Sequence, residues 1–92
     1  MGNKLSIIKR NMNFIKEDML PGGVKVEVFS NKEAIIEGCK GIMEYNDDYI
    51  KINIGRGSIV FTGDELFAYS YFGETLVIKG RINNIEYCVV KR

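Results

Sequence analysis

The stretch Gly41–Ile54, GIMEYNDDYIKINI, decides the fold class of this chain. It contains two segments of β-type periodicity, Gly41–Tyr45 and Tyr49–Ile54, joined only by the turn-forming residues 46–48. So short a link predicts an antiparallel hairpin, because a parallel crossover needs a dozen or more residues. In the second segment the isoleucines alternate with polar residues, so we expect them to point into the core.

The same rhythm extends over most of the chain, from Val24 to Val90. Glycine-, asparagine- or aspartate-containing turns separate short apolar segments, which predicts about 7–8 short antiparallel strands. A flat sheet of this size would leave an apolar face wet, so the sheet must curl. We therefore expect one antiparallel β domain over residues 24–92, built as a small β-roll, sandwich or incomplete barrel. The expected strands begin with the alternating Val24, Val26 and Val28 and continue as Glu33–Cys39, Gly41–Tyr45, Tyr49–Ile54, Ser58–Thr62, Leu66–Phe72, Thr75–Lys79 and Arg81–Val90.

Finer features of the strand pattern also carry predictions. The inward phase slips by one residue between Ile82 and Ile85, around Asn83-Asn84, which indicates a β-bulge. Residues 38–41, GCKG, predict a bend or a bulge. Three segments are apolar on both faces, so we expect their second face to be covered by another sheet, by a helix or by another copy; they are Ala34-Ile35-Ile36, Ile59-Val60-Phe61 and Leu76-Val77-Ile78.

The N-terminal residues 1–20 show a different, helical periodicity. Apolar residues recur at spacings of three and four, which predicts one amphipathic helix ended by Pro21 and the glycines after it. The helix has three open roles: a cover for the sheet, an exposed handle for a partner or for self-association, or a segment lying on an anionic membrane. The apolar stripe consists of Leu5, Ile8, Met12, Ile15 and Met19.

Composition excludes several function classes. The 92 residues carry 13 basic and 12 acidic side chains, and a net charge of +1 gives no bulk attraction to nucleic acid. Histidine is absent, and Cys39 and Cys88 are read as reduced core thiols of a cytoplasmic protein. We expect no catalytic, cofactor or metal site, and the clustering of Glu33, Glu37 and Glu44 that an enzyme would need is not expected. No apolar run is long enough to span a membrane.

Aromatic residues provide the sharper candidates for a contact surface. Tyr69 and Tyr71 are two residues apart in one expected strand, so we expect them to share a face. Stacked nucleobases would need basic residues between the aromatics, and Phe67–Phe72 carries none. A protein interface is the preferred interpretation. The predicted interaction surface therefore comprises Tyr69, Tyr71, Leu5, Ile8, Met12 and Ile15.

Several segments together resemble the YabP/YqfC family of bacterial sporulation proteins, most closely its YqfC branch. The residues that carry the resemblance are Ile36–Tyr45, Tyr49–Ile54, Val60–Leu66, Val77–Ile82 and Ile85–Tyr87. The resemblance implies a protein of endospore-forming bacteria that is needed for spore development and has no known enzymatic activity. It also implies a membrane-anchored partner encoded nearby, and it provides no catalytic residues to carry over.

The expectation is thus a non-enzymatic interaction or scaffold module of spore development. It would dock on a membrane-anchored partner or assemble with copies of itself, and lie in the cytoplasm or peripherally at the developing spore membrane through that partner. The alternative is a small barrel that binds a ligand or single-stranded nucleic acid through an aromatic sheet face.

Overall fold

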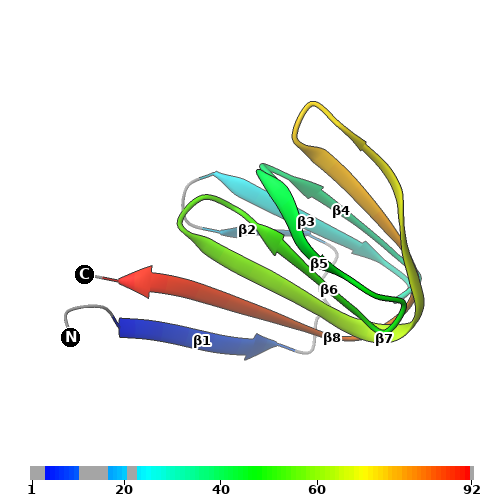
Figure 1. Cartoon of the computed structure of the whole chain (residues 1–92), viewed down its shortest axis with the longest axis horizontal. Helices are drawn as coiled ribbons and strands as arrows, with labels where there is room; N and C mark the ends of the chain where they lie inside the picture. The colour runs from blue at the N-terminus through cyan, green and yellow to red at the C-terminus, as the bar shows by residue number, and fades with distance from the viewer. Residues whose placement is uncertain (1–3, 11–16, 21–22, 92) are drawn as a thin grey trace.

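The chain is a mainly β protein. A computed structural model describes residues 4–10, 17–20 and 23–91. In these residues eight strands form one antiparallel sheet, drawn in Figure 1. The strands are β1 (Lys4–Arg10), β2 (Glu17–Leu20), β3 (Val24–Phe29), β4 (Glu33–Glu37), β5 (Gly41–Tyr45), β6 (Tyr49–Asn53), β7 (Gly57–Phe72) and β8 (Thr75–Lys91).

The long hairpin of β7 and β8 organises the sheet. Its two strands lie at the centre of the order β2-β3-β4-β8-β7-β6-β5, and β1 pairs with β8 as well. The segment Thr75–Lys79 pairs with β4, whereas β8 from residue 85 onward pairs with β1. The hairpin therefore carries two groups of strands: β2, β3 and β4 along the half near its tip, and β1, β5 and β6 along the other half.

The hairpin bends between these two halves, at a place we call the corner (Figure 1). Gly63 of β7 and Gly80 of β8 lie there. The β7–β8 register shifts on both sides of Gly63. A Cβ atom on Gly63 would overlap the carbonyl group of Arg81, and one on Gly80 would overlap the carbonyl group of Glu65. Glycine is required at both positions because the two backbones approach each other too closely for any side chain.

The bend gathers the inner faces of both halves around one core. Alternate residues of β3, β4, β6, β7 and β8 point inward, as the period of two requires. The members are apolar throughout and none of the described buried residues is charged. The buried set is Val24, Val26, Val28, Ala34, Ile36, Cys39, Ile50, Ile52, Ile54, Ile59, Phe61, Leu66, Leu76, Ile78, Ile82, Ile85 and Tyr87.

The structure confirms the mainly β, antiparallel fold as an open, bent sheet. The bulge predicted near Asn83 is present, because Thr62 pairs with Asn84 and Gly63 pairs with Ile82. The predicted breaks at residues 63–65 and at residue 80 are wrong. Backbone pairing continues through the corner, so four expected short strands are the two long strands β7 and β8.

The predicted N-terminal helix over residues 1–20 is not confirmed. Lys4–Arg10 and Glu17–Leu20 are strands, and residues 11–16 lie outside the described residues. The physical reason is tertiary, because β8 and β3 present backbone groups that a strand satisfies and a helix does not. The adjacent β-branched residues Ile7 and Ile8 also favour an extended backbone. Among the described residues, no helix has the length and apolar character that crossing a membrane requires.

Candidate interaction surface

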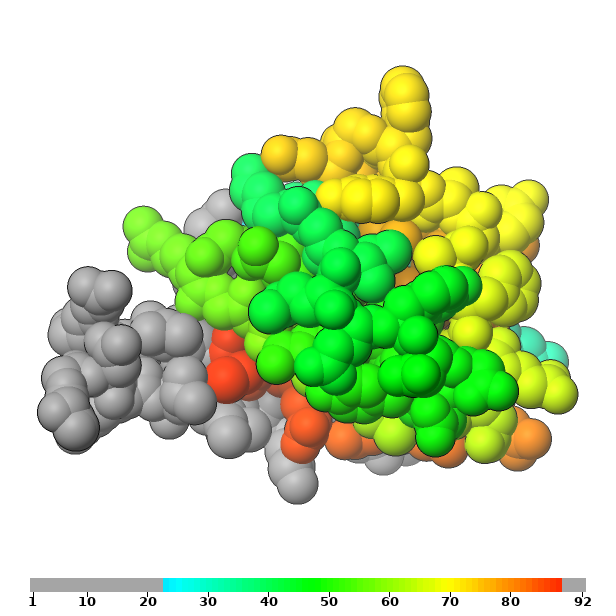
Figure 2. Space-filling model, viewed as in Figure 1, coloured from blue at the N-terminus to red at the C-terminus, as the bar shows by residue number. Residues whose placement is uncertain are grey.

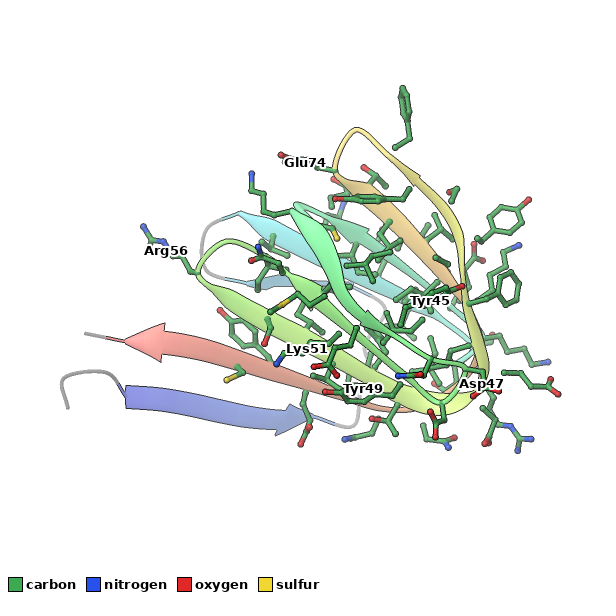
Figure 3. The ribbon with its side chains drawn as sticks, viewed as in Figure 1. Tyr45, Asp47, Tyr49, Lys51, Arg56 and Glu74 are labelled. Carbon is green, nitrogen blue, oxygen red and sulfur yellow. The ribbon has the colours of Figure 1, made fainter. Side chains whose placement is uncertain are left out.

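Two tyrosines join the free edge of β5 to the half of β7 near the hairpin tip, along a line that we call the seam. The Tyr45 hydroxyl accepts a hydrogen bond from the backbone N–H of Ala68 at 2.9 Å. Tyr71 donates its hydroxyl proton to the backbone carbonyl of Cys39, also at 2.9 Å. Figure 3 shows Tyr45 reaching from β5 to β7. Tyr45 thus reaches from β5 to the backbone of β7, and Tyr71 reaches from β7 to the backbone of Cys39, just before β5.

Backbone contacts close both ends of the seam. At one end the Glu74 carbonyl accepts from the N–H groups of Gly38 and Cys39, at 3.0 and 2.9 Å. At the other end the carbonyls of Asp47 and Asp48 accept from β7 amides at the corner, at 2.7 and 3.1 Å. Figure 2 shows β5 and β6, in green, lying against this part of β7, in yellow. The pair Asp47-Asp48 is therefore a structural hairpin tip, and no acidic, thiol or imidazole cluster suited to a metal ion exists among the described residues.

Glu74 also carries a charge contact at the tip of the β7–β8 hairpin. Its carboxylate lies 3.0 and 3.2 Å from the Lys40 ammonium, and both side chains are about half exposed. Solvent screening leaves such a pair with little effect on stability. Glu74 adopts a positive φ of 67°, as does Gly73 before it at 58°. Two consecutive positive φ values are the geometry of a type I′ hairpin turn, for which glutamate is a poor residue.

The outward side of the tip-side half carries exposed aromatic residues, and we call it the outer face. Phe29 at the end of β3 and Phe67 in β7 are each 44% exposed, and Tyr69 is 61% exposed. The Lys79 ammonium lies 3.8 Å from the centroid of the Tyr69 ring, within cation–π range. The outer face is defined by Phe29, Glu33, Ile35, Phe67, Tyr69, Val77 and Lys79.

Tyr69 and Tyr71 do not share a face, so that prediction is wrong. The β7–β8 register shifts between Ala68 and Ser70, which makes Tyr69 the extra residue of a bulge. Tyr71 lies opposite the buried Leu76 and turns toward the inside, whereas Tyr69 lies with Lys79 on the outer face. One tyrosine therefore belongs to the seam and the other to the outer face.

One protein-family model matches the part of the chain that contains most of this sheet. The model of the YabP family matches residues 22–91, which include every strand from β3 to β8. The chain belongs to the YabP family. Membership indicates a sporulation-related protein, and the match does not distinguish the YqfC branch. No curated protein matches the chain, and no solved structure matches it.

The N-terminal members of the predicted surface lie outside the matched YabP region. Leu5 and Ile8 are in β1, where they pair with Val90 and Tyr87 of β8. Met12 and Ile15 lie outside the described residues. The structure thus does not bring the predicted stripe together with Tyr69 or Tyr71 within the residues it describes.

Sequence reasoning missed Phe29, Phe67 and Lys79 of the outer face. The sequence did contain a signal for Phe29. In the alternation of β3 it falls on the same side of the strand as the polar residues Lys25 and Glu27, opposite the inward valines. No comparable signal existed for Lys79, because its place beside Phe67 and Glu33 depends on pairing between strands distant in sequence.

Two phenols of this YabP-family chain have perturbed acidity. Partial burial raises the pKa of Tyr71, and its interaction with Cys39 and the nearby Glu74 carboxylate act in the same direction. Burial also raises the pKa of Tyr87, and the positive charge of Arg56 opposes this effect. The buried Tyr87 hydroxyl has no hydrogen-bond partner among the described residues.

Neither cysteine forms a disulfide. Cys39 is buried in the core and Cys88 is half-buried in β8, and both are free thiols. The predicted core position is confirmed for Cys39 and not for Cys88. The Cys39 carbonyl is the acceptor for Tyr71, so this residue acts in the seam through its backbone.

A shallow open depression of about 330 Å³ lies beside the corner. It is lined by Lys32, Glu65, Gly80 and Arg81, and the Arg81 guanidinium is already 3.6 Å from the Asp64 carboxylate. The mixed charges of this lining give no preference for an anionic or a cationic ligand.

Proposed function

We propose that this chain is a non-enzymatic interaction module of spore development. It docks on a membrane-anchored sporulation partner or assembles with copies of itself, and it works in the cytoplasm, peripherally at the developing spore membrane through that partner. YabP-family membership supports the sporulation context. The observation that carries the binding role is the set of aromatic side chains that the sheet leaves exposed to solvent.

Exposed aromatics at these positions are a source of binding free energy. Phe72 at the hairpin tip is 87% exposed, in addition to Phe67 and Tyr69 of the outer face. Burying an exposed large apolar side chain is worth about 1.5–3 kcal/mol. Tyrosine and phenylalanine are enriched at protein interfaces, where a few such anchors provide most of the binding free energy. The sheet fixes the backbone that carries them, so little backbone entropy is lost on binding.

The chemical composition supports the same proposal. The sequence has no histidine and nearly balanced charge, so neither imidazole catalysis nor electrostatic attraction to a polyanion accounts for the surface. The outer face combines aromatic and aliphatic residues with one acidic residue, Glu33, and one basic residue, Lys79, which is the composition of a protein interface.

The test is capture of partners from sporulating cells of an endospore former. The tagged chain is expected to retain a membrane protein after mild detergent extraction, and to sediment with membranes only while that protein is present. The double variant Phe67→Ser, Tyr69→Ser should lose this partner. Tyr49→Ser, on β6 in the other half of the sheet, is the matched control and should retain it.

A chain that captures no protein, stays monomeric and remains in the soluble fraction of sporulating cells would contradict the proposal. Loss of the partner in the Tyr49→Ser control as well would show that the aromatic substitutions act through the fold.

A further inference from the structure

The outer face has a self-complementary pattern of side chains. The strand pairings place Phe29, Glu33, Lys79 and Phe67 side by side in one row across β3, β4, β8 and β7. The next row places Ile35 beside Val77 at its centre. Since strands are about 4.8 Å apart, neighbours in a row are in contact range of each other and of any sheet laid over them.

Consider a two-fold axis that runs parallel to the strands, above the outer face and over the boundary between β4 and β8. Rotation about this axis places a second copy on the face, with the order of residues in each row reversed. A second copy then lays Phe67 over Phe29, Lys79 over Glu33 and Val77 over Ile35, and each contact occurs twice. In the first row apolar side chains meet apolar side chains and each charge meets its opposite, and in the second row Ile35 meets Val77. Glu27, at the end of the second row, comes to lie over the uncharged Ser70. The arrangement is that of an isologous dimer, in which the same patch serves both subunits.

The placement of the charges suits such a contact. Ile35 and Val77 are half-buried at the centre of the face, while Glu33 and Lys79 lie toward the end of the strands near the β3–β4 turn. Interfaces bury an apolar centre and keep charge at the rim, where desolvation is small. Among the described residues Glu33 forms no ion pair, so its carboxylate is available to a second copy.

We propose that the chain forms a face-to-face homodimer through this outer face, with a second copy as the occupant. The proposal deepens the function proposed above and rests on it. Two sheets would pack about 10 Å apart in an aligned sandwich. The second copy would supply the cover expected for two of the three strand segments that are apolar on both faces, residues 34–36 and 76–78.

The size of the face determines the expected strength. Four strands about 4.8 Å apart, with outward residues about 6.6 Å apart along each, outline roughly 400 Å² on each copy. The total of about 800 Å² lies below the roughly 1,200–2,000 Å² of stable complexes. The dimer should therefore be weak, dissociate on dilution and weaken further as salt screens its charge pairs.

The experiment is sedimentation of charge-reversal variants, alone and mixed. Glu33→Lys or Lys79→Glu alone would place like charges opposite each other at both symmetric contacts and weaken the dimer at least about tenfold. When the two variants are mixed in equal amounts, the introduced lysine of one faces the introduced glutamate of the other, and the native Lys79 faces the native Glu33. Opposite charges then meet at both contacts, so a heterodimer should form. Restored association in the mixture cannot come from a variant that has lost its fold.

Glu44→Lys and Lys51→Glu provide matched controls with the same net charges. These two residues are also cross-strand partners, but in β5 and β6 of the other half of the sheet. Each control variant should dimerise like the wild type, alone and mixed.

Three results would overturn the proposal: a wild type that is monomeric up to millimolar concentration, a Glu33→Lys variant that dimerises normally, or a mixture that stays monomeric. Capture of the membrane partner is measured on the same variants. A monomeric wild type that still captures this partner refutes the dimer and leaves the proposed function intact. Loss of the partner in Glu33→Lys, with a monomeric wild type, would assign the outer face to the partner instead of a second copy.

Discussion

Replacing Gly63 by alanine tests whether the corner of the β7–β8 hairpin depends on close backbone approach. The new Cβ would overlap the carbonyl oxygen of Arg81 and lie 2.9 Å from its carbonyl carbon and 3.2 Å from the Cα of Ile82. Neither strand can move aside freely. The Gly63 N–H is bonded to the Asp48 carbonyl at 3.1 Å, and the Ile82 N–H is bonded to the Asn31 carbonyl at 2.8 Å.

The expected cost follows from these contacts. Overpacking costs about 1–3 kcal/mol, and losing the backbone hydrogen bond at Gly63 adds about 1 kcal/mol. The sum of about 2–4 kcal/mol is a large part of the roughly 5–14 kcal/mol that a domain of this length has in total. Thermal unfolding followed by circular dichroism should show a melting temperature lowered by at least about 10 °C.

Gly41→Ala is the matched control for the corner variant. A Cβ on Gly41 meets no atom within 4 Å, and its φ is not positive. The substitution should be neutral or stabilise by about 0.5 kcal/mol, because alanine restricts the unfolded chain. If Gly63→Ala melts at the same temperature as Gly41→Ala, the corner does not require the close approach that the structure shows.

Three further substitutions test the seam, the core and the hairpin tip. Tyr45→Phe removes the acceptor of the Ala68 N–H, so it should lower the free energy of unfolding by about 0.5–1.5 kcal/mol. It should also speed hydrogen exchange of the Ala68 amide, measured by NMR. An unchanged exchange rate would contradict the hydrogen bond across the seam. Tyr87→Phe removes a buried hydroxyl without a partner among the described residues and should raise the stability at neutral pH by about 1 kcal/mol. Because burial raises the pKa of Tyr87 in the fold, ionisation of this phenol leaves the stability unchanged below pH about 10 and lowers it as pH rises through the folded pKa. The variant lacks the phenol, so it should lose less stability than the wild type in an alkaline denaturation series. Glu74→Gly relieves the backbone strain of glutamate at a positive φ and removes one exposed ion pair to Lys40. Because the exposed ion pair contributes little, the melting temperature should rise. A lower melting temperature would show that the ion pair dominates.

The inward pattern of the strands was predictable from the sequence because it is local. Val24, Val26 and Val28 alternate with polar residues, and all three are buried as expected. The bulge at Asn83 was also visible, because an extra residue shifts the phase of the apolar residues on either side of it. Period-two alternation is sufficient for such inferences wherever one face of a strand is buried.

The corner and the seam could not be predicted because they depend on contacts between distant segments. A glycine is an equally good signal for a turn and for a close backbone approach, and only the pairing of β7 with β8 shows that Gly63 and Gly80 serve the second purpose. The bulge at Tyr69 contains no turn residue, so nothing in the local sequence separates Tyr69 from Tyr71. The helical spacing of the N-terminal residues was a local signal that tertiary pairing with β8 overrides in Lys4–Arg10.

β4 carries core residues and outer-face residues in alternation. Ala34 and Ile36 point into the core, where their burial stabilises the sheet regardless of any partner. Ile35 and Glu33 point the other way, where contacts within the chain leave them partly exposed. Because the two sets alternate, the outer residues are free to match a second surface without disturbing the core. Contacts among the described residues leave the apolar members of the outer face partly exposed, which is why the proposed dimer is built on this side of the strand.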